Sequence, residues 1–194
     1  MKEETIPPLN LFLVCRKPDP AALRAPPEGV RFRTCLPEEL DIWKALSAGD
    51  PQYSDFMTEY YNKVYAAQQE EFFRRCTFAC REDGVPVGTC FLWKACGRVN
   101  TLHWFRVLPE YEGRGIGRAL LTHLLRDLDP QDLPVYLHTH PSSCRAVKLY
   151  SDLGFELISC PQVGFRKNDL EESLPYLRKY MPPEAFARLR ITQP

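Results

Sequence analysis

The chain has 194 residues, of which 25 are lysine or arginine and 25 are aspartate or glutamate, so its formal net charge is zero. This balance excludes an overall basic protein of the kind that binds nucleic acid or anionic membranes. The hydrophobic fraction of 44% is that of an ordinary soluble globular protein. The length is enough for one domain with a substantial core. No apolar run approaches the ~20 residues of a membrane span. From the neutral charge and this absence, we expect neither nucleic acid nor membrane as a partner.

Eight cysteines are present, but none forms a Cys-x-x-Cys pair. Neither a zinc ribbon nor a thioredoxin-type redox motif is therefore predicted. The apolar run at 9–15 is short and is interrupted by Asn10, which is not the pattern of a signal peptide. We expect a cytoplasmic protein whose thiols are reduced.

The first third of the chain is predicted to alternate short elements with connections. Residues 10–16 are expected to form an outlying strand, and the proline-rich segment 17–29 a connector. A strand is predicted at 30–34 and a helix at 37–48. The longest helical pattern, 54–75, has an aromatic stripe at i, i+4 and i+8. It predicts one long helix that packs in the core and leaves some tyrosines for a binding pocket.

The middle of the chain has the pattern of an antiparallel meander. Strands at 77–81 and 86–94 flank an Asp-Gly turn and predict a hairpin, and a third strand is expected at 99–107. The strand predicted at 135–139 follows a helix, so it is expected to be parallel to its partner. Further predicted elements are helices at 114–127, 144–153, 169–180 and 183–189, and a closing pair of strands at 156–160 and 163–167.

A glycine-rich turn joins the strand at 99–107 to the helix that follows it. Gly113, Gly115 and Gly117 alternate with larger residues just before the helical pattern begins. The first backbone N–H groups of a helix have no partner within it, and they are partly positive. Glycines let an anion approach this backbone, so the turn predicts a phosphate-binding cradle. A dinucleotide fingerprint fails at Leu120, and the Gly-Lys-Ser/Thr of a Walker loop is absent.

Two motifs together resemble those of the GNAT superfamily, the GCN5-related N-acetyltransferases. The cradle is similar to motif A, Arg/Gln-x-x-Gly-x-Gly/Ala, with Glu112 in place of the usual Arg or Gln. Segment 137–155 is similar to motif B, with Ser143 at the usual Asn position and a helix cap expected from Ser142 or Ser143. The matching residues are Gly115 and Gly117 in motif A, and Ala146, Tyr150, Leu153, Gly154 and Phe155 in motif B.

The resemblance implies a GNAT fold of the α/β (α+β) class. Its central sheet would be mixed but mostly antiparallel, with about 6–7 strands, splayed after the fourth core strand and covered by helices on both faces. The implied division is an N-terminal arm at 1–29, an acetyltransferase domain at 30–167 and a C-terminal helical extension at 168–194.

The resemblance also implies where acetyl-CoA binds. The backbone of residues 114–118 would hold the pyrophosphate, and the strand at 101–107 would pair with the pantetheine arm. The N–H of Phe105 would meet the acetyl carbonyl as an oxyanion donor. The implied cofactor-binding residues are Phe105, Val107, Arg114, Gly115, Ile116, Gly117, Arg118 and Ser143.

Three residues are implied in catalysis. Tyr150 matches the family tyrosine that protonates the leaving CoA thiolate. His138 lies where ribosomal-protein alanine N-acetyltransferases have a catalytic Glu, and His103 lies where arylalkylamine N-acetyltransferases have a catalytic His. Either is a candidate general base, with His138 preferred, and strand alternation places His103 on one face with Phe105 and Val107. His138 and His140 also have the spacing of metal ligands, but nothing completes a site, so no metal is expected.

The resemblance therefore predicts an acetyl-CoA-dependent N-acetyltransferase. An amine acceptor, either a small molecule or a peptide, would attack the thioester directly in a ternary complex, and the protein would be a monomer or a homodimer. The alternative is a catalytically inactive GNAT fold that binds CoA as a sensor or scaffold. Glu112 supports this alternative, because a carboxylate near a pyrophosphate is electrostatically unfavourable.

Overall fold

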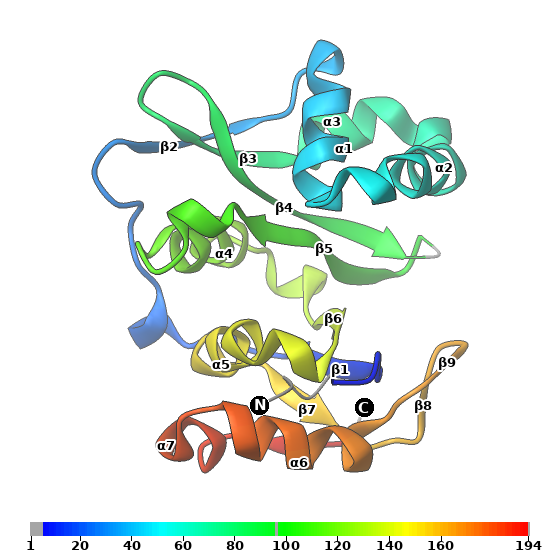
Figure 1. Ribbon diagram of the computed structural model, residues 1–194, viewed down its shortest axis with the longest axis vertical. Coiled ribbons are helices and arrows are strands. Elements are labelled where there is room, and N and C mark those ends of the chain that lie inside the picture. The colour runs from blue at the N-terminus through cyan, green and yellow to red at the C-terminus, as the bar shows by residue number, and fades with distance from the viewer. Residues whose placement is uncertain (1–5, 96, 194) are drawn as a thin grey trace. The chain divides into compact units, whose positions relative to one another are not determined.

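The computed structural model describes residues 6–95 and 97–193 (Figure 1). Its contacts divide the chain into two compact units. Unit 1 contains the described residues of Met1–Ala22, Ala95–Thr101 and Leu128–Pro194. Unit 2 contains Leu23–Lys94 and Leu102–Asp127.

The strands follow the hydrogen-bonded order β10-β7-β1-β6-β5-β4-β3-β2 in an eight-stranded sheet. Most neighbouring pairs are antiparallel, whereas β5–β6 and β10–β7 are parallel. The predicted fold class is confirmed, including the parallel pairing of β6. The strands of this sheet are β1 (Leu11–Cys15), β2 (Val30–Thr34), β3 (Thr77–Arg81), β4 (Pro86–Ala95), β5 (Val99–Val107), β6 (Val135–Thr139), β7 (Glu156–Ile158) and β10 (Ile191–Thr192).

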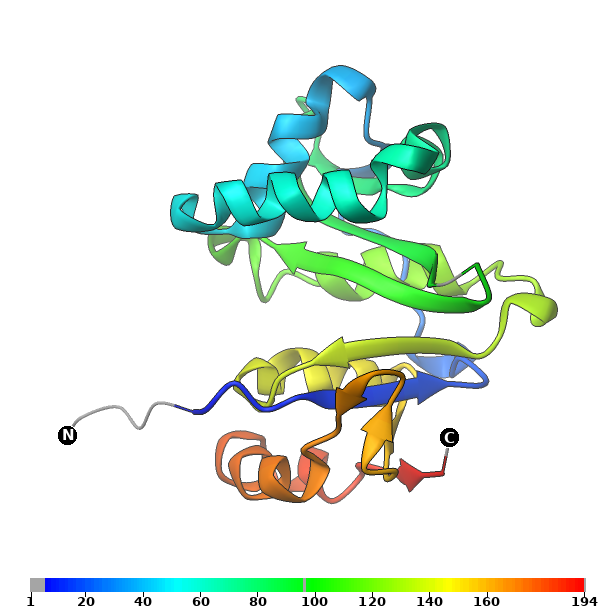
Figure 2. The ribbon, with the colours of Figure 1, turned by 90° about the vertical axis from the view of Figure 1, so that its right-hand side faces the viewer.

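In unit 2, helices cover both faces of the strands. Three helices, α1 (Leu40–Ala48), α2 (Ser54–Val64) and α3 (Gln69–Arg75), lie together on one side of β3–β5, and α4 (Ile116–Leu125) lies on the other (Figures 1 and 2). Their shared core is aromatic: Trp43, Tyr65, Phe72, Phe78 and Phe91 are fully buried.

The single long helix predicted at 54–75 is wrong. The chain forms α2, a 3-10 turn at Ala66–Gln68 and then α3, although no glycine or proline marks the interruption. Tyr65 and Phe72 are both fully buried against Trp43, with ring centroids 5.9 Å and 4.9 Å from it. This tertiary packing overrides the local helical propensity.

In unit 1, the predicted outlying strand is an interior one. β1 pairs with β6 over its whole length and with β7 on its other edge, and all five of its residues are buried. The helices of this unit are α5 (Cys144–Asp152), α6 (Leu170–Tyr180) and α7 (Pro183–Phe186). Since both edges of β1 are paired, its continuous apolar run is that of a fully buried strand.

The predicted closing pair of strands is also wrong. β7 pairs with β1 and β10, while β8 (Gln162–Val163) and β9 (Arg166–Lys167) form a separate hairpin. Gly164 takes a left-handed φ of 59° between β8 and β9, so the chain turns back there. Figure 2 shows this hairpin in orange beside β1 and β6. None of the described helices is both long and apolar enough to cross a membrane.

Candidate functional site

The glycine turn before α4 has the open backbone that an anion cradle needs. Gly113 and Gly115 have left-handed φ values of 76° and 84°, which side chains other than glycine rarely adopt. Gly115 is the N-cap of α4 and makes no side-chain cap. A β-carbon added at either glycine would meet no atom within 4 Å. The first N–H groups of α4, at Ile116, Gly117 and Arg118, have no acceptor within the helix.

The charged residues of this loop differ in what they contact. Arg114 donates from Nη2 to the carbonyl of Glu110 at 2.9 Å, and its guanidinium lies 5.1 Å from the ring of Tyr111. It therefore packs on its own loop, on the 3-10 turn Pro109–Tyr111. Glu112 is exposed to solvent. Water and salt weaken its repulsion of a bound anion.

Strand β5 contains a backbone irregularity at Trp104. This residue has a left-handed φ of 51°, which is a strained conformation for a bulky side chain. In a regular strand, successive side chains point to opposite faces. Here consecutive residues His103 and Trp104 both contact the hydroxyl of Tyr65. The predicted alternation from His103 to Phe105 and Val107 therefore does not hold at this point.

His103 is held in the aromatic core of unit 2. Its Nδ1 lies 2.5 Å from the hydroxyl oxygen of Tyr65, which also accepts the indole N–H of Trp104 at 2.9 Å. Burial lowers the pKa of His103 to about 4, because the charged imidazolium loses its hydration. The imidazole is therefore neutral at pH 7.

His138, in unit 1, has partners on both ring nitrogens. Nη1 of Arg166 lies 3.0 Å from Nδ1, and Oδ1 of Asn10 lies 2.9 Å from Nε2. Because arginine only donates, Nδ1 must be the acceptor, and Nε2–H donates to Asn10. Burial first, and then the positive charges of Arg166 and His140, lower the pKa of His138 to about 4.

His140 lies beside His138, with ring centroids 4.9 Å apart. Its Nδ1 lies 2.8 Å from the carbonyl oxygen of Leu9, so this nitrogen donates. Within the part of the chain that the structure describes, no group of three or more His, Cys, Asp or Glu side chains is arranged to hold a metal.

Tyr150 and Ser143 lie on the other predicted motif. Tyr150 is buried on α5, with its ring 5.8 Å from that of Phe155. Ser143 occupies the N-cap position of α5, as predicted, but its side chain makes no capping hydrogen bond. Gly154 follows the helix with a left-handed φ of 98°. A β-carbon there would lie 2.7 Å from the carbonyl oxygen of Lys17.

The model of the acetyltransferase (GNAT) family matches residues 42–155, which are more than half of the 194 residues. The matched range includes the cradle, the two candidate bases His103 and His138, and Tyr150. The chain belongs to the GNAT acetyltransferase family.

Known GNAT proteins resemble the chain over different lengths. Mycothiol acetyltransferase of Frankia casuarinae is 29% identical over 169 residues, covering 75% of this chain and 48% of that protein. Ribosomal protein bS18-alanine N-acetyltransferase of Escherichia coli is 39% identical over 56 residues, covering 28% of this chain and 38% of that protein. The chain thus spans about half or less of the length of these curated relatives. A solved GNAT acetyltransferase from Colwellia psychrerythraea shares the fold, with a TM-score of 0.56 and 19% identity over 79% of this chain and 54% of that chain.

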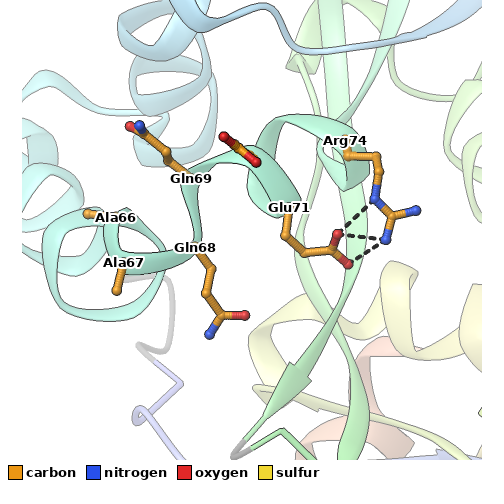
Figure 3. Close-up of a pocket in the computed structure, with 7 residues that line it drawn as sticks. Ala66, Ala67, Gln68, Gln69, Glu71 and Arg74 are labelled. Carbon is orange, nitrogen blue, oxygen red and sulfur yellow. Dashed lines mark hydrogen bonds and ion pairs between the residues drawn. The ribbon is translucent and has the colours of Figure 1, made fainter.

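The cradle fits the pyrophosphate of the CoA that GNAT acetyltransferases use. Its open left-handed glycines and the N-terminus of α4 offer N–H donors and a partial positive charge. A separate open pocket of about 520 Å³ lies on the 3-10 turn Ala66–Gln68 and α3 (Figure 3). Glu71 and Arg74 form an ion pair at its rim. It contains none of the predicted GNAT residues.

Sequence reasoning missed the residues that surround the two histidines. Tyr65 and Trp104 contact His103, and Asn10 and Arg166 contact His138. No motif marks these neighbours. They come from segments far apart in the sequence, or, in the case of Trp104, from a strand irregularity that no glycine signals. The predicted residues fall in both units: the cradle, His103, Phe105 and Val107 in unit 2, and His138, Ser143 and Tyr150 in unit 1.

Proposed function

We propose that this protein is an acetyl-CoA-dependent N-acetyltransferase in which an amine attacks the thioester directly in a ternary complex. The observation that supports this most strongly is the cradle: two left-handed glycines, open to an anion, at the start of α4. In the proposed reaction the amine nitrogen bonds to the acetyl carbonyl carbon and the carbon–sulfur bond breaks. A charged amine loses two protons on the way to the amide, one before it attacks and one as the tetrahedral intermediate collapses. The CoA thiolate takes up one proton from the acid, and the other leaves through the base to solvent.

Tyr150 is the proposed acid, and the N–H of Phe105 the proposed donor to the developing oxyanion. A buried phenol gives a proton more readily to a thiolate than water does, since its ordinary pKa near 10 is much closer to the thiol's 8.5. Phe105 directly follows the left-handed Trp104.

The base is needed because an alkyl amine, with a pKa near 10.4, is almost entirely charged at pH 7. Both His103 and His138 are candidates, and the geometry favours His103. Both nitrogens of His138 have partners, and Nδ1 faces a cation. The hydroxyl of Tyr65 also has a hydrogen bond with Tyr60. If Tyr65 donates to Tyr60 and accepts from Nδ1–H of His103, then Nε2 of His103 is the basic nitrogen.

The test is the release of free thiol from acetyl-CoA across amines, amino acids, polyamines and peptides. Once an acceptor is found, Tyr150→Phe is expected to lower kcat about 100-fold with CoA affinity unchanged. His103→Gln is expected to do the same. His123→Gln is the matched control, because this α4 histidine packs on Phe32 outside the proposed site. Full activity of Tyr150→Phe at every pH would refute the acid.

The same measurements separate catalysis from the sensor alternative. A sensor would be stabilised by CoA, with a higher melting temperature, but would release no thiol with any acceptor. Glu112 is exposed to solvent, so its carboxylate is expected to repel the pyrophosphate only weakly and not to prevent CoA binding. We therefore expect Glu112→Gln to change CoA affinity by less than about threefold, the effect of a screened surface charge.

A further inference from the structure

Arg106 occupies an unusual position on β5, directly after Phe105. Its side chain is partly buried, and its guanidinium packs on the backbone of Gly49. A β-carbon built on Gly49 would lie only 1.9 Å from Nη2 and 2.5 Å from Nη1 of Arg106. Gly49 ends α1 with a left-handed φ of 69° and is itself exposed. The guanidinium is thus placed at the exposed C-terminal end of α1.

Arg106 has no anionic partner among the residues that the structure describes. The carboxylate of Asp50, next to Gly49 in the chain, accepts two hydrogen bonds from Gln52, one from the backbone N and one from Nε2, both at 3.0 Å. Several other arginines of unit 2 are paired with carboxylates: Arg33 with Glu39, Arg74 and Arg75 with Glu71, and Arg81 with Asp83.

An aromatic surface lies on the same side of β5. Trp104 contacts Tyr60 with ring centroids 5.1 Å apart and Phe56 at 6.5 Å, and its other edge reaches Trp43 of α1 at 6.1 Å. Phe56 is 52% exposed. We name Phe56, Tyr60 and Trp104 the aromatic rim. Both the rim and the guanidinium of Arg106 contact α1 or α2, so they lie on the face of β5 that these helices cover.

We propose that Arg106 binds the carboxylate of the acceptor, and that the acceptor is a free amino acid with a large apolar side chain. This inference rests on the proposed function. A guanidinium matches a carboxylate with two parallel hydrogen bonds, and partial burial strengthens such a pair. In an α-amino acid the amine and the carboxylate are two bonds apart. A carboxylate on Arg106 therefore holds the amine close to the guanidinium, on the face of β5 that α1 and α2 cover, while the side chain contacts the aromatic rim.

The experiment compares phenylalanine with phenylalanine amide as acceptors, by the rate of thiol release from acetyl-CoA. The wild type is expected to prefer the acid. Arg106→Gln is expected to raise KM for phenylalanine about 10- to 100-fold, the effect of one charge-assisted pair, and to change kcat/KM for the amide by less than about threefold. Arg106→Lys is expected to recover only part of the loss. Arg31→Gln, an exposed arginine on β2, is the matched control.

A second variant tests the same placement without removing the charge. Gly49→Ala would push the guanidinium aside, and is expected to reproduce the selective loss seen with Arg106→Gln. Gly29→Ala has a similar left-handed φ of 75° but no atom within 4 Å of the added carbon, so it controls for backbone strain. The melting temperature of each variant is measured alongside the rates.

The outcomes are distinct. Equal losses for phenylalanine and its amide, accompanied by a lower melting temperature, would mean that Arg106 only stabilises the end of α1, and would overturn the proposal. A wild-type preference for the amide would overturn it as well. If the wild type acetylates neither compound nor any other amine, the proposed function itself fails, and the role of Arg106 in acceptor binding fails with it.

Discussion

Tyr65 and His103 are joined by a 2.5 Å contact between the phenol oxygen and Nδ1 of the imidazole. Tyr65 is also the C-cap residue of α2. The same contact thus involves the interrupted helix and the irregular strand β5, because Trp104 next to His103 donates to the same oxygen. These two departures from regular structure are coupled through one buried hydroxyl.

The low pKa of His103 predicts that unit 2 loses stability in mild acid. The pKa is lowered from 6.5 to about 4 by burial. Between these values the unfolded chain takes up a proton that the folded chain does not, so the free energy of unfolding falls as pH decreases. Above pH 6.5 the imidazole is neutral in both states, so this loss of stability is absent. Between pH 4 and 6.5 His103 changes the free energy of unfolding by up to about 1.4 kcal/mol per pH unit. Denaturant unfolding at several pH values measures it.

His103→Gln is expected to remove this part of the slope. Tyr65→Phe is expected to keep it, since burial and not the hydroxyl lowers the pKa, while lowering stability at every pH by about 1 kcal/mol for the lost hydrogen bonds. Identical slopes for the wild type and His103→Gln would show that the imidazole is not desolvated.

The cradle predicts a difference between two glycines of similar φ. Gly115 and Gly84 have φ values of 84° and 88°, and neither has an atom within 4 Å of an added β-carbon. Alanine at either position is expected to cost about 1–2 kcal/mol of stability for the left-handed conformation. Only Gly115→Ala is also expected to weaken CoA binding, about tenfold or more, because the methyl group would lie where the pyrophosphate approaches.

Isothermal titration with CoA checks this prediction, and thermal unfolding confirms that the two variants are equally destabilised. Weakened CoA binding in Gly84→Ala would indicate that the effect comes from general loss of structure. Unchanged affinity in Gly115→Ala would remove the cradle from the binding site.

Local patterns predicted most of the elements, because hydrophobic period and turn chemistry act over a few residues. The hairpin at β3–β4 and the helix after Gly115 are examples. The break at Tyr65 was not predictable, since it depends on the packing of Tyr65 and Phe72 on Trp43, far away in the sequence. The interior position of β1 was missed for a similar reason. An apolar run predicts a strand but does not show which neighbours will pair with its edges.

Some residues of the candidate site were likewise predictable from the sequence, and others were not. Glycines and Tyr150 belong to motifs with fixed spacing, so their positions on a turn and a helix were predictable. The partners of each histidine were not, because they come from other elements and follow no motif. His138 shows the consequence: its sequence position made it a candidate base, whereas Arg166 and Asn10 use both ring nitrogens.

Gly154 in motif B is predicted to be required for packing. Its φ is 98°, and a β-carbon would lie 2.7 Å from the carbonyl oxygen of Lys17 and 3.1 Å from the amide nitrogen of Asp19. Both are backbone atoms, and the Asp19 N–H is bonded to the carbonyl of Leu153 at 3.0 Å. Gly154→Ala is therefore expected to cost about 3 kcal/mol or more, for backbone strain and displaced chain together.

Gly164→Ala provides the control within unit 1, because its φ is 59° and nothing lies within 4 Å of the added carbon. It is expected to cost only the ~1–2 kcal/mol of a left-handed alanine. Chemical denaturation compares the two variants. Equal losses would show that the segment at residues 17–19 moves away at little cost.

Arg166 is predicted to control the protonation of His138. Its guanidinium donates to Nδ1 at 3.0 Å and is one cause of the pKa near 4, after burial and before His140. Arg166→Gln removes the positive charge, so the pKa of His138 is expected to rise by about one unit toward 6.5 while burial keeps it below that value. Titration of the imidazole signals by NMR measures this directly and does not depend on activity.

Two variants make this prediction specific. Arg178→Gln removes a cation of unit 1 that lies over the ring of Phe186, and is expected to leave the pKa of His138 unchanged. Asn10→Ala removes the acceptor of Nε2–H, which frees one nitrogen but keeps the nearby charge, so its effect is expected to be smaller than that of Arg166→Gln. If Arg166→Gln and Arg178→Gln give the same pKa, then Arg166 does not hold the neutral imidazole, and His138 regains equal standing with His103 as the base.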